Sequence, residues 1–328
     1  MLPAGEKNKI KGYAIEVDNL SKSFSFQPAL SNVTFRVLRG AVHGFLGPNG
    51  AGKTTAIKIM LGLVAADTGQ VRVLGEPLSF GHRHNYLQLL NYLPQDPVFP
   101  EGLTGREALT LVAGMYKIDR HKSRSRIDKL LEHFELQAAA NRRVGVYSRG
   151  MQQRLGLAAV LLTEPELLIL DEPVSALDPD GRRRVLDIIN RLKGRATVFF
   201  SSHILADVER VCDHVTIIDR GRKLLDAETS DLLTRYAMEQ YIITVRPEDH
   251  SRAARLISQN CYVSQVTPHL NQLHVVSKPG QSLEMGEKLL FELISQGIVV
   301  REFVPNRTNL EDAFFRVIEE HHLAEQTK

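Results

Sequence analysis

The sequence predicts an α/β protein with a mixed, mainly parallel sheet core, an antiparallel edge sheet, a helical insertion and a small α+β C-terminal domain. Short continuous apolar runs suit parallel strands that helices bury on both faces, and they occur at residues 41–46, 167–170, 197–200 and 215–218. Residues 97–163 lack such runs and show helical patterns instead. A break in character near residues 227–240 separates the small domain from the rest.

The elements of the large domain are predicted in order along residues 13–227. Alternating apolar residues such as Val33, Phe35 and Val37 indicate half-buried strands at a sheet edge. Helical patterns follow at residues 106–117, 124–136 and 151–163. They form the insertion, about residues 97–163, which precedes the apolar strand at 167–170. Within it, the basic run at 120–129 is interpreted as a solvated helix face.

A short helical linker at residues 228–238 leads to the predicted C-terminal domain, residues 239–320. Strand and helix patterns alternate there in the order β-α-β-β-α-β, at residues 240–246, 251–258, 262–267, 272–277, 284–296 and 298–304. That order favours a small split-βαβ, or ferredoxin-like, domain. A final helix at 309–320 places Leu310, Ala313, Phe314 and Val317 on one face. Residues 1–12 and 321–328 are expected to be flexible tails.

Composition limits the classes of function. The formal charge of +3 over 328 residues is nearly balanced, so it does not indicate a nucleic-acid partner. Cys212 and Cys261 lie far apart, which argues against a disulfide framework or a zinc site and fits a reducing cytosol. The chain has no apolar run of about eighteen residues, the length needed to span a bilayer. A role at a membrane would therefore require a partner.

The segment GPNGAGKTT has the G-x4-G-K-[ST] spacing of a phosphate-binding loop and lies between a predicted strand and a predicted helix. Its glycines let successive N–H groups meet phosphate oxygens at the helix start. Lys53 adds a charge for the β- and γ-phosphates, and Thr54 a hydroxyl for Mg²⁺. A glycine-rich turn with a surface lysine does not explain the full pattern. The predicted nucleotide contacts are Gly47, Pro48, Asn49, Gly50, Ala51, Gly52, Lys53, Thr54 and Thr55.

Two carboxylates end the apolar strand in LLILDEP. Ligands of open α/β sheets bind at the carboxyl ends of the strands, where Asp171 and Glu172 fall. Asp171 is predicted to hold Mg²⁺, directly or through water. Glu172 is predicted to be the general base that polarises the attacking water. The alternative is that Glu172 is only a solvated residue at a strand end, and the presence of a phosphate loop in the same chain disfavours this.

With these motifs in place, residues of about 15–225 resemble the ATP-binding subunits of ABC (ATP-binding cassette) transporters, which implies a P-loop NTPase fold. Gln95 in YLPQD resembles the Q-loop, which links Mg²⁺ and water to the membrane partner. Asp178 in SALD resembles the D-loop. His203 in SSHIL resembles the switch histidine that contacts the γ-phosphate. Phe24 in SKSF falls where the family stacks the adenine ring.

The segment YSRGM occupies the place of the family's LSGGQ signature and departs from it at Tyr147, Arg149 and Met151. The chemistry requires a serine hydroxyl and a glycine N–H at a helix start, aimed at the γ-phosphate. Ser148 and Gly150 retain both groups. Arg149 adds a charge that could approach phosphate or a neighbouring loop.

The resemblance implies an enzyme, an ATPase that uses ATP and Mg²⁺. Glu172, His203, Lys53 and Gln95 would be catalytic, and Thr54, Gln95 and Asp171 would form the metal site. Because the signature of one protomer closes on the phosphate loop of another, one set of motifs per chain implies a dimer, with itself or with a related ATPase subunit. ATP would close that dimer and hydrolysis would release it.

The leading hypothesis is an ATPase that powers export through a separate integral membrane permease, from the cytoplasmic, inner face of the cell membrane. The tail NLEDAFFRVI resembles that of bacterial drug- and antibiotic-exporter ATPases. One alternative is a soluble ABC ATPase acting on ribosomes or nucleic acid, disfavoured by the single cassette and the balanced charge. Another is a nucleotide-gated binding module without turnover, disfavoured because Glu172 and His203 are intact.

Overall fold

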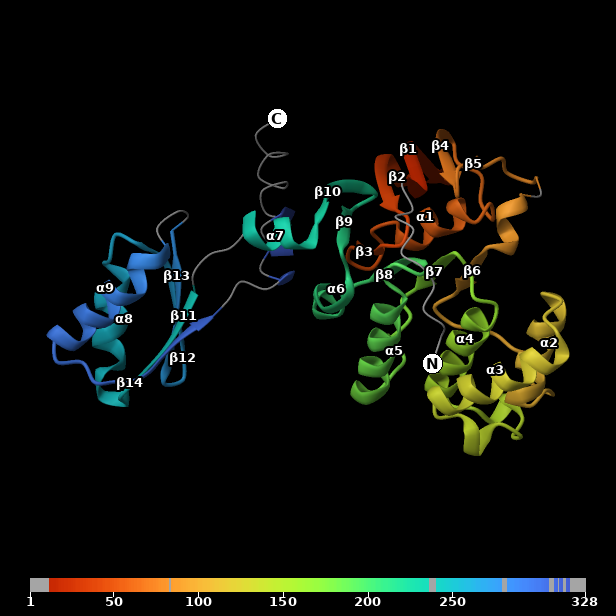
Figure 1. Ribbon diagram of the computed structural model, residues 1–328. Helices are drawn as coiled ribbons and strands as arrows, with labels where there is room; N and C mark the ends of the chain where they lie inside the picture. Colours follow the sequence, from red (N-terminus) through yellow and green to blue (C-terminus); the bar gives the residue numbers. More distant parts are fainter. Residues whose placement is uncertain are drawn as a thin grey trace. The chain divides into compact units, whose positions relative to one another are not determined.

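A computed structural model describes residues 12–82, 84–235, 240–278 and 282–306, together with residues 310, 311, 313, 314, 317 and 318 (Figure 1). The chain divides into two compact units, Met1–Thr229 and Ser230–Lys328. Residues 1–11 and 321–328 of the predicted tails, and residues 236–238 of the predicted linker, lie outside the described residues.

The central sheet of the first unit has the strand order β10-β9-β3-β8-β7-β6. Its parallel strands are β3 (Val42–Leu46), β6 (Leu90–Leu93), β7 (Leu167–Asp171), β8 (Thr197–Ser202) and β9 (His214–Asp219), and β10 (Arg222–Glu228) runs antiparallel to β9. Strands β3, β7 and β8 are buried along their whole length, as their apolar runs require. The predicted mixed, mainly parallel sheet is therefore confirmed.

The antiparallel edge sheet has the order β2-β1-β4-β5. It comprises β1 (Tyr13–Phe24), β2 (Gln27–Leu38), β4 (Thr68–Val73) and β5 (Glu76–Pro77). The apolar sides of this sheet, helix α1 (Lys53–Met60) and the central strands share one hydrophobic core, in which Phe35, Ile57 and Phe199 are fully buried or nearly so. This packing fixes the start of α1 against two sheets.

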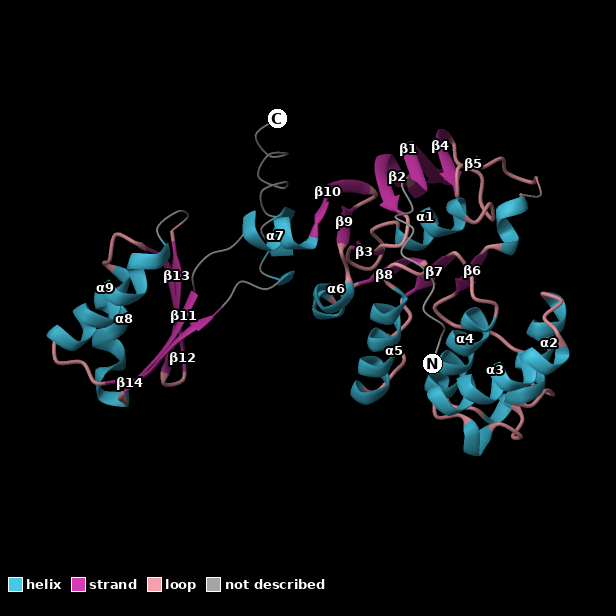
Figure 2. Cartoon of the chain, in the orientation of Figure 1, coloured by secondary structure: helices cyan, strands magenta, loops and turns pink. Residues whose placement is uncertain are grey.

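The helical insertion contains α2 (Gly105–Met115), α3 (Arg120–His133) and α4 (Arg149–Leu162), which lie together on one side of the strands in Figure 2. Each begins at a residue whose side chain accepts a backbone N–H: Thr104, Asp119 and Ser148. Helices α5 (Pro179–Leu192) and α6 (Leu205–Val211) follow β7 and β8. Short 3₁₀ turns lie at Asn85–Gln88, Gln137–Ala139, Val144–Val146 and Pro247–Asp249.

The second unit begins with most of α7 (Thr229–Arg235) and continues with an antiparallel sheet ordered β12-β13-β11-β14. Its elements are β11 (Gln240–Val245), α8 (His250–Ser258), β12 (Val263–His269), β13 (Gln272–Ser277), α9 (Ser282–Ser295) and β14 (Val300–Asn306). This is a split βαβ arrangement. Residues from strands and helices, such as Ile243, Ile257 and Leu293, share a core that is separate from that of the first unit.

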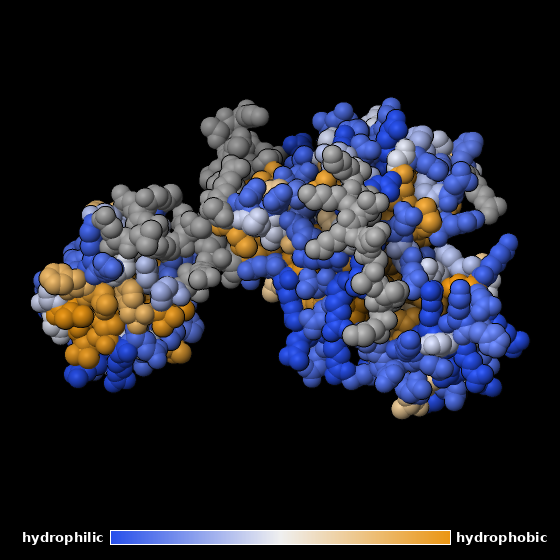
Figure 3. All heavy atoms as spheres, viewed as in Figure 1, coloured by the Kyte–Doolittle hydropathy of each residue, from blue (hydrophilic) through white to orange (hydrophobic). Residues whose placement is uncertain are grey.

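Apolar side chains also reach the surface of the second unit, where Figure 3 shows them gathered over α9. Phe291 and Ile294 of that helix are 74% and 59% exposed. Of the predicted final helix only six residues are described, and Leu310, Ala313, Phe314 and Val317 among them are buried. Within the described parts of the chain, no helix combines the length and apolarity needed to cross a bilayer.

Candidate nucleotide site

The predicted phosphate loop connects β3 to α1, and its glycines are required by close contacts. A Cβ atom added at Gly47 would lie 2.4 Å from the carbonyl oxygen of Ile218. Gly52 has φ +102°, and a Cβ there would lie 2.5 Å from the carbonyl oxygen of Ala29. Gly50 also has a positive φ, +82°. The loop therefore holds its curled backbone only with glycine at these positions.

The start of α1 is available to an anion. Among the described residues, no side chain caps its first N–H groups, and its first turn contains no acidic residue. Lys53 is 5% exposed, and its Nζ donates to the carbonyl oxygens of Gly47 at 2.7 Å and Pro48 at 3.2 Å. The lysine thus lies across its own loop, with its charge beside the uncapped helix start. Such a site attracts phosphate.

Asp171 ends β7 and is held from two sides. Its Oδ2 accepts a hydrogen bond from the hydroxyl of Thr54 at 3.0 Å, and its Oδ1 accepts one from the hydroxyl of Ser201 at 2.5 Å. The aspartate is 2% exposed. The structure therefore brings together Thr54 and Asp171, two of the three residues that the sequence predicts for the metal.

Glu172 connects the loop to the switch histidine. One carboxylate oxygen lies 3.5 Å from Lys53 Nζ, and the other lies 2.8 Å from His203 Nδ1. Because a carboxylate can only accept, Nδ1 of the histidine is the donor in this contact. Glu172 is 8% exposed and has φ +47°. A left-handed backbone is uncommon for a residue other than glycine, and such strain is typical of functional sites.

The Q-loop begins where β6 ends, beside β7. Leu93 of β6 pairs in register with Leu170 of β7, so Gln95 follows at the same sheet edge as Asp171, and it is exposed. Burial, and then the negative charge of Asp171, raise the pKa of Tyr92 to about 12. Tyr92 therefore stays neutral beside the carboxylates at physiological pH.

The signature segment begins helix α4 with a capped N-terminus. Ser148 Oγ accepts the N–H of Met151 at 3.3 Å. A Cβ at Gly150 would lie 3.2 Å from the carbonyl oxygen of Ala176, so the signature lies against the D-loop of its own chain. Arg149 resolves the alternative left open by the sequence: it forms an ion pair with Asp96, at 2.7 Å. Asp96 directly follows Gln95, so Arg149 reaches a neighbouring loop, the Q-loop.

Asp178 of the D-loop is a helix cap, since its Oδ1 accepts the N–H of Gly181 at 3.3 Å at the start of α5. In the same region Arg182 Nε contacts Asp207 Oδ1 of α6 at 2.6 Å. Burial raises the pKa of Asp207 despite this arginine. The pair ties the helix after the D-loop to the helix that follows His203.

Phe24 is the last residue of β1 and is 48% exposed. Lys22 Nζ lies 5.4 Å from the centre of its ring. Phe26, in the turn between β1 and β2, is fully exposed. The sequence prediction named Phe24 for the adenine and did not consider Phe26.

The donor set fits Mg²⁺ with ATP. A hydroxyl and a carboxylate oxygen, both hard ligands, face each other beside an uncapped helix start and a buried lysine. Magnesium with ATP needs only one or two protein oxygens, because phosphates and water fill its other positions. In the described ranges, no group of three His, Cys, Asp or Glu side chains could hold a metal ion.

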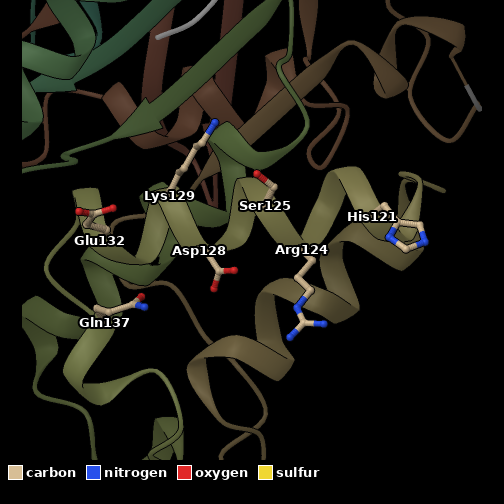
Figure 4. A pocket seen from close by; sticks show the side chains of 7 residues that line it. All are labelled: His121, Arg124, Ser125, Asp128, Lys129, Glu132 and Gln137. Carbon is tan, nitrogen blue, oxygen red and sulfur yellow. The ribbon is translucent and has the colours of Figure 1, made fainter.

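A separate hollow of about 410 Å³ lies on the outer face of α3, as Figure 4 shows. Its lining alternates in charge along the helix, with Arg124, Asp128, Lys129 and Glu132. It includes none of the predicted nucleotide residues. Most side chains of the basic run at 120–129 are exposed, as expected for a solvated face.

Comparison with known proteins identifies the family. The model of the ABC transporter family matches residues 30–175. The bacitracin transport ATP-binding protein BcrA of Bacillus licheniformis is 35% identical, over 93% of this chain and 97% of the relative. The daunorubicin resistance ATP-binding protein DrrA3 of Streptomyces coeruleorubidus is 36% identical, over 74% of this chain and 76% of the relative.

A solved structure of an ATP-binding subunit of an ABC transporter superposes with a TM-score of 0.62 at 34% identity, covering 68% of this chain and 93% of that one. Sequence, fold and the geometry of the phosphate loop thus agree. The chain belongs to the ABC transporter family as an ATP-binding subunit that hydrolyses ATP.

Proposed function

We propose that this subunit drives export through a separate membrane permease by closing as a dimer on two MgATP molecules. Lys53 and the start of α1 bind the phosphates, and Thr54, Asp171 and Gln95 hold Mg²⁺. Glu172 orients the attacking water as general base, and His203 contacts the γ-phosphate. Phe24 stacks on the adenine. When bound, Mg²⁺ supplies charge neutralisation on the phosphate oxygens.

The observation that carries the proposal is the cluster of the buried Lys53 and Glu172 with the exposed His203. Its members come from α1, the end of β7 and the segment after β8, and the central carboxylate contacts the other two at 3.5 and 2.8 Å. A carboxylate between a phosphate-binding cation and a histidine can hold a water molecule near a γ-phosphate. A nucleotide-binding module that does not hydrolyse ATP would not need a carboxylate at this position.

Dimer closure is supported by the two kinds of helix start. Helix α1 offers uncapped N–H groups, whereas Ser148 and Gly150 lie at the start of α4, beside the D-loop. We infer that Ser148 and Gly150 of one protomer reach the γ-phosphate in the other protomer, with Asp178 nearby. The partner protomer is a second copy or a related ATPase subunit.

Export is supported by the relatives whose names refer to bacitracin transport and daunorubicin resistance. The word resistance in the second name fits the removal of a compound from the cell. The permease would dock at the inner face of the membrane, near the Q-loop. Exposed apolar side chains occur on both sides of that loop, with Leu89 before β6, Val98 after Gln95 and Met115 at the end of α2. The hydrogen bond from Tyr116 to Asn91 brings the last of these close to β6.

The first test replaces the proposed general base. Glu172→Gln should lower ATP hydrolysis by about 10²–10⁴-fold while leaving ATP-dependent dimerisation intact. Glu166→Gln, just before the other end of β7, is a matched control and should hydrolyse ATP like the wild type. Hydrolysis by Glu172→Gln at the wild-type rate would remove Glu172 from the mechanism.

A second test identifies the partner. Tagged Glu172→Gln protein, trapped with MgATP, would be recovered from membranes and its partners identified by mass spectrometry. We expect a membrane protein with several spans. Recovery of ribosomal or DNA-associated partners without any permease would instead support a soluble ATPase.

A further inference from the structure

We infer that Ser201 is a positioning residue for ATP hydrolysis: its buried hydroxyl links Asp171 to the backbone of Glu172 and fixes the two carboxylates relative to each other. This inference rests on the roles proposed above for those two residues. Ser201 is the next-to-last residue of β8, two positions before His203. It contacts neither nucleotide nor metal in the proposed mechanism, so it acts through its neighbours.

The hydroxyl of Ser201 makes two hydrogen bonds of opposite sense. It donates to Asp171 Oδ1 at 2.5 Å and accepts the N–H of Glu172 at 3.0 Å. The peptide N–H, the hydroxyl and the carboxylate thus form a short chain in which each bond polarises the next. Ser201 is fully buried, so solvent does not replace either bond.

Strand register produces this arrangement. Strands β7 and β8 are parallel neighbours, and Asp171 pairs with Ser201 across the ladder. The ladder places Ser201 beside the last strand residue, where the backbone turns away into the loop. At that point the N–H of Glu172 would otherwise lack a ladder partner, and the serine hydroxyl takes that place.

The bond to Glu172 acts on a strained residue. Glu172 has φ +47°, and such a conformation costs about 1–3 kcal/mol for residues other than glycine. A structure that holds this conformation must compensate for the strain locally. The N–H to Ser201 Oγ bond is one restraint, and the carbonyl of Glu172, which accepts from the hydroxyl of Ser175 at 3.1 Å, is another. Together they aim the carboxylate of Glu172 at Lys53 and His203.

The hydrogen bond from Ser201 to Asp171 orients the carboxylate that is proposed to hold Mg²⁺. Oδ1 is occupied by Ser201, so Oδ2 is the oxygen that faces Thr54. Removing the hydroxyl would let the carboxylate rotate and would leave two buried polar groups without this partner. Loss of such outer contacts typically lowers metal affinity by about 10–100-fold.

The test compares three variants of the full-length chain. Ser201→Ala removes the hydroxyl, and Ser201→Cys keeps a similar volume with a much weaker hydrogen-bonding group. The matched control, Thr197→Val, removes a hydroxyl at the opposite end of the same strand, which accepts the N–H of Gly40 at 2.9 Å. Measurements are kcat and KM for ATP, the Mg²⁺ concentration at half-maximal rate, the thermal midpoint, and calorimetric ATP binding with and without Mg²⁺.

For both Ser201 variants we expect kcat to fall about 10–100-fold with little change in KM, since a small misplacement of reacting groups has an effect of that size. The half-maximal Mg²⁺ concentration should rise about tenfold or more. Calorimetry should show a weaker gain in ATP affinity on adding Mg²⁺, and unchanged affinity without it. Thr197→Val should lower the thermal midpoint by about as much as the Ser201 variants do. Its kcat, KM and Mg²⁺ dependence should stay those of the wild type.

Two results would overturn the inference. One is wild-type kcat and Mg²⁺ dependence in Ser201→Cys or Ser201→Ala when Glu172→Gln is inactive. The other is an equal loss of kcat in Thr197→Val, which would make the effect one of general stability. If instead Glu172→Gln hydrolyses ATP normally, the proposed role of Glu172 fails, and that failure is distinguishable from both.

Discussion

The starts of helices α1 and α4 are built differently, although both are proposed to meet the same phosphate. The N-cap residue before α1 is Gly52, and among the described residues no side chain caps this helix. The N-cap residue before α4 is Ser148, whose hydroxyl accepts the N–H of Met151. One helix start is open to an anion, and the other is satisfied by its own residue.

This difference suits two separate events, ATP binding at α1 and dimer closure through α4. An open helix start with a buried lysine can take up a phosphate without first breaking a hydrogen bond. At α4 the Ser148 hydroxyl accepts the N–H of Met151 at 3.3 Å, and its own hydrogen remains available to donate to a phosphate. We therefore expect ATP to be taken up at α1 of one protomer, and α4 of the partner protomer to engage it afterwards.

The largest expected effect comes from adding a side chain at Gly52, the residue before α1. Gly52→Ala should weaken ATP binding by more than about tenfold, because moving the loop loses charge-assisted contacts worth about 1.5–3 kcal/mol each. The added Cβ would meet the carbonyl of Ala29 at 2.5 Å. Calorimetric titration with ATP measures this. Gly50→Ala is the control: it shares a positive φ, but no described atom lies within 4 Å of its Cβ, so equal losses in the two variants would point to strain alone.

The second effect concerns the capped start. Ser148→Ala should lower ATP hydrolysis by about 10²-fold through loss of a phosphate donor, and helix stability by about 1 kcal/mol through loss of the cap. ATP binding to the isolated protomer should not change. Thr104→Ala removes the equivalent cap of α2 and should show the stability loss with normal hydrolysis. A parallel drop in ATP binding by Ser148→Ala would mean that the signature acts within its own chain.

The third effect concerns β3, the strand that leads into the phosphate loop and the start of α1. Burial, and then the nearby His214, lower the pKa of His43 in β3 from 6.5 to about 3. His43 therefore gains a proton below about pH 6.5 in the unfolded chain, whereas in the folded chain it stays neutral down to about pH 3. The free energy of unfolding therefore falls as the pH decreases from 6.5 towards 3. The loss should reach about 2 kcal/mol between pH 7 and pH 5. Urea unfolding of wild type and His43→Gln checks it, since the variant should have a flatter pH profile; equal slopes would contradict the assignment.

The smallest effect concerns the ion pair beside the capped start. Arg149 and Asp96 are 65% and 64% exposed in their side chains. A double-mutant cycle with Arg149→Ala and Asp96→Asn should give a coupling energy of about 0.5 kcal/mol, falling further at high salt. Unfolding curves at low and high salt measure it. A coupling well above 1 kcal/mol would show that the pair is a structural lock between signature and Q-loop.

Much of the site could be predicted because its residues are close in sequence. The spacing from Gly47 to Thr54 encodes a loop and helix start directly, and Asp171 with Glu172 follows an apolar strand. Strands β4, β6 and β10 were not predicted, since they are short or carry few buried residues: in β4 only Val71 and Val73 are buried. Their pairing partners supply what their own sequences do not indicate.

Ser201 and Asp96 were missed for a different reason. Both carry ordinary polar side chains, and each acts through a contact across 30 or 53 positions of sequence. The segment SSHIL drew attention to the histidine alone. A serine two residues earlier could have been noted as a polar interruption at the end of an apolar strand.

The sequence by itself determined the family, the order of the apolar central strands and of the helices in the insertion, and the chemistry of the phosphate loop, because these depend on local spacing and on which faces are apolar. The tertiary structure decided which groups meet at the carboxyl ends of the strands. Parallel register set Ser201 opposite Asp171, and packing of α1 between two sheets set Lys53 beside Glu172. Those contacts arise from hydrogen-bonded ladders and buried surfaces that form between distant segments, so no local pattern can specify them.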